Sequence, residues 1–100
     1  MPTLDQLHKL LAAEPGDPFL LYGMAQELAR LNRGGEALGY FDRCLAADPN
    51  YLYAYYHKAR VLAEMGDGAG ARGVLALGLS RAATDPHAAS EMQSLLDSLD

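Results

Sequence analysis

A spacing of 34 residues relates two parts of this chain to each other. A fixed period of this length is typical of repeat proteins, in which each unit buries its apolar face only by stacking on a neighbour. The period therefore constrains the fold more than any other feature, and it favours binding as the function. Residues of matching character stand 34 apart in the pairs Pro15/Pro49, Leu21/Tyr55, Ala25/Ala59, Leu28/Leu62, Ala37/Ala71, Phe41/Leu75 and Leu45/Leu79.

Composition limits the kinds of partner that we expect. The 100 residues are half apolar, which predicts one small domain. Eight Lys and Arg against 13 Asp and Glu give a net charge of -5, and without a basic cluster a nucleic acid partner is not expected. The one cysteine, Cys44, suits a reducing compartment. No apolar run is long enough to span a membrane, so we expect a cytoplasmic protein with no membrane partner.

Apolar residues at helical spacing predict six helices, at about residues 3–13, 18–31, 36–47, 51–65, 69–82 and 86–99. Residues 14–18 and 48–50 contain proline, which ends one helix and suits the first turn of the next. Asn and Gly in residues 32–35, and Gly in residues 66–68, tolerate positive φ in tight turns. The expected fold is all-α, and the middle four helices form two hairpins.

These hairpins resemble the tetratricopeptide repeat. The family has large residues at repeat positions 4, 11 and 24 and small ones at positions 8, 20 and 27, so that the helices can approach closely. The resemblance implies a right-handed superhelix of antiparallel helical hairpins, an α-solenoid. The large residues here are Leu21, Leu28, Phe41, Tyr55, Leu62 and Leu75, and the small ones are Ala25, Ala37, Cys44, Ala59, Ala71 and Gly78.

The resemblance also suggests how one domain over residues 1–100 is organised. Residues 3–15 look like the second helix of a half-present preceding repeat, and residues 18–51 and 52–83 form two full repeats. Pro86 stands three residues beyond the family's closing proline position, and with that offset Met92 falls on position 4. Residues 86–99 are then a capping helix on the second repeat.

In this family the first helix of each hairpin lines a concave groove. The resemblance places Phe19 against Tyr53 and Tyr22 against Tyr56 as a ladder of rings, which suits peptide binding. Alternatively, the rings only pack against one another, and Arg60 is either solvated or paired with Glu64. The full set of expected groove residues is Phe19, Tyr22, Gln26, Arg30, Tyr53, Tyr56, His57, Arg60 and Glu64.

Catalysis finds little support in the sequence. The three histidines lie on different predicted helices, and no His, Cys or carboxylate cluster has a metal-binding spacing. Cys44 takes the place of a small buried residue, which indicates packing and not a nucleophile. We therefore expect no enzyme activity, no catalytic residue, no metal and no cofactor.

Two functions remain open. The first is a protein–protein interaction module, monomeric, that binds a partner peptide or protein segment in the concave groove. Some family members clamp a peptide carboxylate with lysine and asparagine, but Tyr22, Gln26 and His57 stand at those positions here. A two-carboxylate clamp is therefore not expected, although Arg30 and Arg60 could hold one acidic group. The alternative is a structural repeat segment that self-associates as a homodimer, or stacks within a larger protein, without a peptide ligand.

Overall fold

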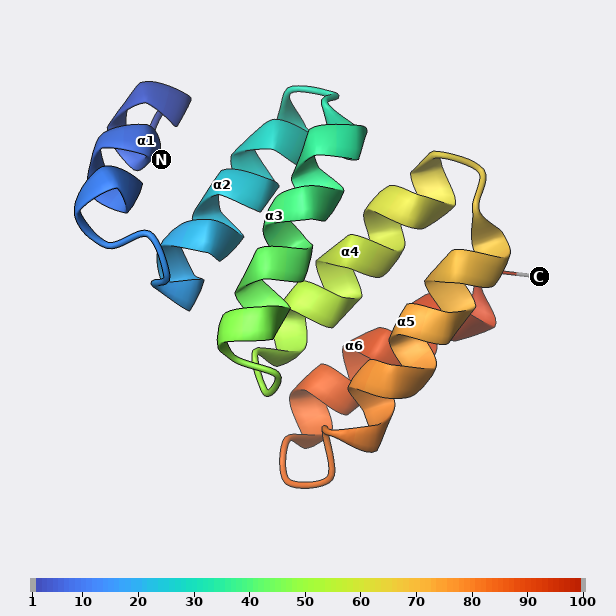
Figure 1. The fold of residues 1–100 in the computed structure, drawn as a ribbon. Helices are drawn as coiled ribbons and strands as arrows, with labels where there is room; N and C mark the ends of the chain where they lie inside the picture. The colour runs from blue at the N-terminus through green and yellow to red at the C-terminus, as the bar shows by residue number, and fades with distance from the viewer. Residues whose placement is uncertain (1, 100) are drawn as a thin grey trace. The chain divides into compact units, whose positions relative to one another are not determined.

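The computed structural model describes residues 2–99, which form six α-helices and, within that range, no strand (Figure 1). The all-α helical-repeat class predicted from the sequence is confirmed, and each predicted helix boundary lies within two residues of the observed one. The helices are α1 (Leu4–Ala13), α2 (Pro18–Arg30), α3 (Gly34–Ala47), α4 (Leu52–Glu64), α5 (Gly68–Ser80) and α6 (Pro86–Asp97).

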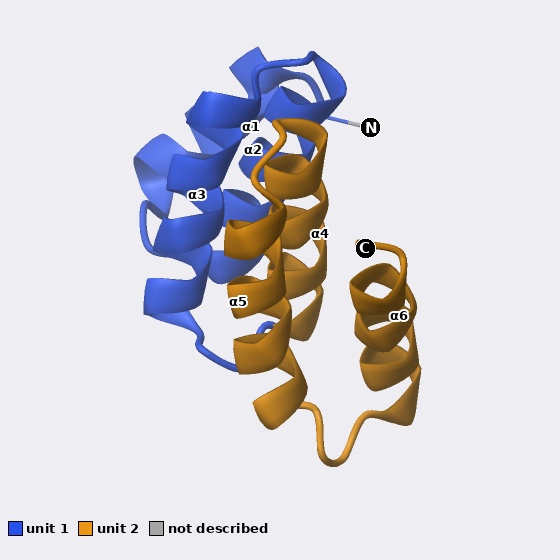
Figure 2. Ribbon diagram, turned by 90° about the vertical axis from the view of Figure 1, so that its right-hand side faces the viewer, with its two compact units in different colours: residues 1–51 blue, residues 52–100 orange. Residues whose placement is uncertain are grey.

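The chain divides into two compact units, residues 1–51 and residues 52–100 (Figure 2). In the first unit, α2 packs against both α1 and α3. In the second unit, α4 packs against α5 and α6, and α5 also packs against α6. Each unit therefore contains one helical hairpin and one additional helix.

Side-chain caps fix where several helices begin. The Asp17 carboxylate accepts hydrogen bonds from the first backbone N–H groups of α2, and Asp67 and Asp85 do the same for α5 and α6. Thr3 forms a capping box with Gln6 at the start of α1. These bonds satisfy N–H groups that have no partner within the helix.

The turns inside the two hairpins are built alike. Within residues 2–99, Asn32 and Gly66, one repeat apart, are the residues with positive φ, at 61° and 86°. In the first hairpin the backbone N–H of the following residue, Arg33, donates a hydrogen bond to the Leu28 carbonyl oxygen over 2.9 Å. In the second hairpin the N–H of Asp67 donates to the Leu62 carbonyl oxygen over 2.8 Å. The prediction that these turns need residues tolerant of positive φ is confirmed.

The small residues of the repeat pattern lie in the core. Ala25, Ala37, Ala59 and Ala71 are fully buried. At Gly78 a Cβ atom would lie 2.7 Å from Tyr55 Cβ and 2.6 Å from Met92 Sδ. Such close approach explains why these positions carry small side chains.

The last helix begins as α2 does. α2 and α6 begin at Pro18 and Pro86, each preceded by an aspartate cap, and these prolines are two 34-residue steps apart. The buried residues do not follow the same step, because Gln93, two steps from the fully buried Ala25, is exposed. The three-residue offset of the apolar positions and the capping role of residues 86–99 stay predictions.

Candidate protein-binding surfaces

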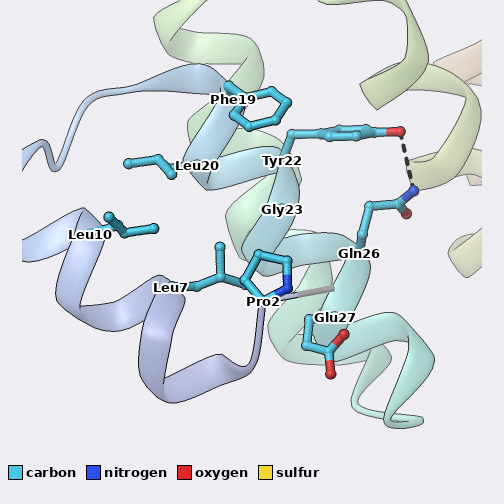
Figure 3. A pocket seen from close by; sticks show the side chains of 9 residues that line it. All are labelled: Pro2, Leu7, Leu10, Phe19, Leu20, Tyr22, Gly23, Gln26 and Glu27. Carbon is cyan, nitrogen blue, oxygen red and sulfur yellow. Dashed lines mark hydrogen bonds between the residues drawn. The ribbon is translucent and has the colours of Figure 1, made fainter.

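In the first unit, the expected groove residues of α2 lie along an open edge. Phe19 is 68% exposed, while Tyr22 and Gln26 are half-buried. The Gln26 side-chain amide donates a hydrogen bond to the Tyr22 hydroxyl over 3.1 Å (Figure 3). This edge thus presents an exposed ring beside a polar pair.

The same residues border a pocket of about 300 Å³, lined by side chains of α1 and α2 (Figure 3). Its walls are almost entirely apolar, with Leu7 and Leu10 on one side and Phe19 and Leu20 on the other. Gly23 lies between them, where a Cβ atom would be 3.3 Å from Leu7 Cδ2. The pocket can accept an apolar group, and the remaining lining residues are Pro2, Tyr22, Gln26 and Glu27.

Tyr22 also belongs to a cluster of rings within the first unit. Its ring centroid lies 4.9 Å from that of Tyr51 and 6.3 Å from that of Phe41. Burial raises the pKa of the Tyr51 phenol, since the charged form loses solvation. Ring packing, the alternative left open by the sequence, is thus present at Tyr22, alongside its position at the pocket.

Arg30 does not offer a free guanidinium. It forms an ion pair with the buried Glu27, and its Nε donates to Glu27 Oε2 over 3.0 Å. This hydrogen bond holds the pKa of the Glu27 carboxyl below its ordinary value. The first role of Arg30 is therefore to neutralise a buried carboxylate, which the sequence did not indicate.

In the second unit, the groove residues of α4 contact one another and α6. The Tyr53 ring lies 6.2 Å from the His87 ring, and the Tyr56 ring meets His57 edge to face at 4.9 Å. The Arg60 guanidinium lies 6.0 Å from the Tyr56 ring centroid. The Arg60 guanidinium also lies 3.9 Å from the Glu64 carboxylate, so the ion pair considered from the sequence is present, at a distance longer than a direct hydrogen bond.

Burial raises the pKa of the Tyr53 phenol, and His57 is a second groove residue of this unit with a shifted pKa. Burial and the nearby Arg60 lower its pKa, and Glu91 partly opposes them. A neutral imidazole is therefore favoured.

The pairs Phe19/Tyr53 and Tyr22/Tyr56 would join residues of the two units, and the ring ladder stays a prediction.

No group of three or more His, Cys, Asp or Glu side chains within residues 2–99 could hold a metal ion. Cys44 is fully buried, and burial together with Asp48 raises the pKa of its thiol to about 11. A thiol that stays protonated and covered is a poor nucleophile.

Over the described residues, every helix is too short or too polar to cross a bilayer.

Sequence reasoning missed several residues of the first surface, namely Leu10, Leu20, Gly23 and Tyr51. The repeat itself held a signal for Leu10, because it stands 34 residues before Cys44, at a position that is small in both hairpins. A large residue at this position indicates that α1 has a different neighbour there from the neighbours of α3 and α5. Tyr51 had no such signal, since it lies in the link between α3 and α4.

Comparisons with known proteins agree on the architecture. The type III secretion translocator chaperone SycD of Yersinia enterocolitica superposes with a TM-score of 0.89 at 17% identity, over 96% of this chain and 68% of that one. PcrH, solved in complex with the chaperone binding region of PopD, gives a TM-score of 0.89 at 19% identity, over 96% of this chain and 74% of that one. A protein of Bordetella parapertussis, solved in solution, gives 0.85 at 27% identity, over 99% of this chain and 88% of that one.

Sequence comparisons place the chain in a family. No curated protein matches it at a significant level. A family model described as tetratricopeptide repeat matches residues 28–95, which is more than half of the chain. The hairpin repeat, the buried small residues and this match lead to one conclusion: the chain belongs to the tetratricopeptide repeat family.

Proposed function

We propose that this chain is a non-enzymatic protein-interaction module that binds a segment of a partner protein through side chains on α2 and α4. The observation that carries the proposal is the apolar pocket of the first unit, with the exposed Phe19 and the Tyr22–Gln26 pair at its edge. Exposed rings next to an apolar recess are what a protein partner can bury.

The comparisons support a protein as the partner class. PcrH, one of the structures with the same fold, was solved with a region of the protein PopD bound. At 19% identity this likeness establishes the fold, and the identity of the segment bound here has to be found by experiment. The proposed binding residues remain Phe19, Tyr22, Gln26, Arg30, Tyr53, Tyr56, His57, Arg60 and Glu64.

The test uses a peptide selected from a displayed random library against the full chain. Tyr22→Ala combined with Tyr56→Ala should weaken its binding by at least about 2 kcal/mol, the scale of an interface hot spot. Tyr40→Ala is the matched control, because Tyr40 is a half-buried tyrosine on α3 outside the proposed set. Circular dichroism should show all variants folded.

Self-association is the competing outcome. Sedimentation should report a monomer at micromolar concentration if the chain functions as a peptide-binding module. A stable dimer, dispersed by Leu95→Asp or Leu99→Asp, together with peptide binding that ignores both tyrosines, would instead favour the stacking function.

A further inference from the structure

Two large apolar side chains of the first unit face the solvent beside the pocket. Leu10 on α1 is 49% exposed and Phe19 on α2 is 68% exposed, and both line the pocket (Figure 3). Exposed apolar groups that share one recess are candidates for a docking site. The second unit of the chain shows what kind of element can cover such groups.

The second unit contains a helix pair equivalent to α1 and α2. Two 34-residue steps carry Leu10 to Gly78 on α5 and Phe19 to His87 on α6. α5 packs against α6 as α1 packs against α2. The α5–α6 pair is therefore an internal counterpart of the α1–α2 pair.

In the second unit a third helix, α4, covers this pair. Tyr55 of α4 lies so close to Gly78 that a Cβ atom there would be 2.7 Å from Tyr55 Cβ. Tyr53, two residues earlier, lies with its ring centroid 6.2 Å from that of His87. One helix thus contacts both of the residues that correspond to the exposed Leu10 and Phe19.

The residue that faces Tyr55 has to be small. Tyr55 packs against Gly78 where a Cβ atom would overlap it, so the tyrosine fits only because residue 78 has no side chain. Because packed interiors hold a nearly constant volume, a larger residue on the second helix requires a smaller one opposite. Leu10 is much larger than glycine, so a covering helix should place alanine, serine or glycine against it.

Charge favours an apolar face on that helix. Of the residues that line the pocket, Glu27 carries the charge, and Arg30 neutralises it through two hydrogen bonds. A charged side chain entering the pocket would lose solvation without gaining an unpaired counter-ion.

We propose that the α1–α2 pocket binds an amphipathic helix of a partner protein that carries an aromatic residue followed two positions later by a small one. The aromatic ring lies against Phe19, and the small residue lies against Leu10. This inference rests on the proposed function, because Phe19 and the pocket belong to both, and it adds Leu10 and the kind of segment that is bound.

The test uses two synthetic peptides with the sequence of residues 52–64, one unchanged and one with Tyr55→Ala. Both carry the same side-chain crosslink on the polar face, because an isolated helix of this length is marginal in water. Each is titrated into the full chain while backbone amide shifts are followed by NMR. The Ala peptide should bind at least about tenfold more tightly than the Tyr peptide and should shift amides of α1 and α2.

A variant of the chain reverses the prediction. Leu10→Gly copies the glycine found at position 78, so this chain should prefer the Tyr peptide. If it does not fold, Leu10→Ala should at least reduce the preference for the Ala peptide. The proposal would be overturned if the native chain and the Leu10 variants showed the same preference between the two peptides. Amide shifts confined to α5 and α6 would also overturn it.

Two further measurements distinguish a partner helix from a second copy of the chain, and the helix site from the proposed function. A dimer seen by sedimentation without peptide and dispersed by Leu10→Asp would make a second copy the occupant and would overturn binding of a partner helix. Tyr56 does not line the pocket, so Tyr56→Ala should weaken binding of the library peptides and leave binding of the crosslinked Ala peptide unchanged. Failure of the helix site is thus distinguishable from failure of the proposed function.

Discussion

The two hairpins have the same repeat pattern but hold different residues at one pair of equivalent positions. These positions hold Leu21 and Cys44 in α2–α3, and Tyr55 and Gly78, which lie in contact, in α4–α5. All four are buried. A larger residue on the first helix accompanies a smaller one on the second, which indicates that the packed volume, and not residue identity, is what the repeat maintains.

The largest effect predicted from this comparison is at Gly78. Gly78→Ala should lower the free energy of unfolding by about 1–3 kcal/mol, because the new methyl overlaps Tyr55 Cβ, which cannot move without the backbone. Cys44→Ala, at the equivalent position, should cost less than about 1.5 kcal/mol. Urea unfolding of both variants measures the difference.

A paired substitution sharpens this result. Gly78→Cys should destabilise on its own, and adding Tyr55→Leu should restore part of the loss, since the pair then matches Cys44 and Leu21. If Gly78→Ala were as stable as the native chain, the two hairpins would not differ in packing tolerance.

A second prediction concerns the reactivity of Cys44. With a pKa of about 11 in place of 9.0, about 100-fold less thiolate is present at neutral pH than for an ordinary cysteine. Full burial slows access further. Labelling of the native protein by a bulky thiol reagent should therefore be slow, and it should accelerate in urea. Rapid labelling without denaturant would contradict the packing role.

Gly39 and Gly73 stand one repeat apart on the exposed faces of α3 and α5, and neither has a neighbour that a Cβ atom would meet. Replacing either by alanine should raise stability by about 0.5–1 kcal/mol, because glycine loses more backbone entropy on folding. Thermal unfolding measures the two gains. Gly70→Ala is the contrast, since its Cβ would crowd the Asp67 cap. Unequal gains at Gly39 and Gly73 would show that the hairpins differ there too.

The smallest predicted effect is a pH dependence of the second hairpin. The lowered pKa keeps His57 neutral in the folded state, while the unfolded chain takes up a proton near pH 6.5. The unfolded state then binds more protons, so stability should fall as the pH drops below about 6.5. His57→Gln should reduce this slope in unfolding experiments at pH 5–7. The equivalent residue of the first hairpin is Gly23, which does not titrate, so an unchanged slope would exclude His57 as the cause.

Much of the fold could be predicted from the sequence because the relevant signals are local. Proline and aspartate mark helix starts at Pro18 and Pro86, and Asn32 and Gly66 mark turns that need positive φ. Pro86, like Pro18, is the first residue of a helix, and both helix starts could be predicted at these residues.

Less of the candidate surface could be predicted, because it depends on side-chain partners in three dimensions. The repeat positions indicated Tyr22 and Arg30, but not that Tyr22 packs on Tyr51 or that Arg30 pairs with the buried Glu27. The pocket was missed since it needs the spacing of α1 from α2 as well as the identity of Leu10.

The positive φ shared by Asn32 and Gly66 has a consequence for mutational tolerance. Few residues adopt this backbone conformation without strain, chiefly glycine, asparagine and aspartate. In a library of all substitutions these two sites should therefore reject most side chains although they are exposed. Arg33, the residue after Asn32, has negative φ and makes no side-chain cap hydrogen bond, so it should accept far more substitutions. An alignment column restricted in this way would record the backbone turn and not a contact with any partner.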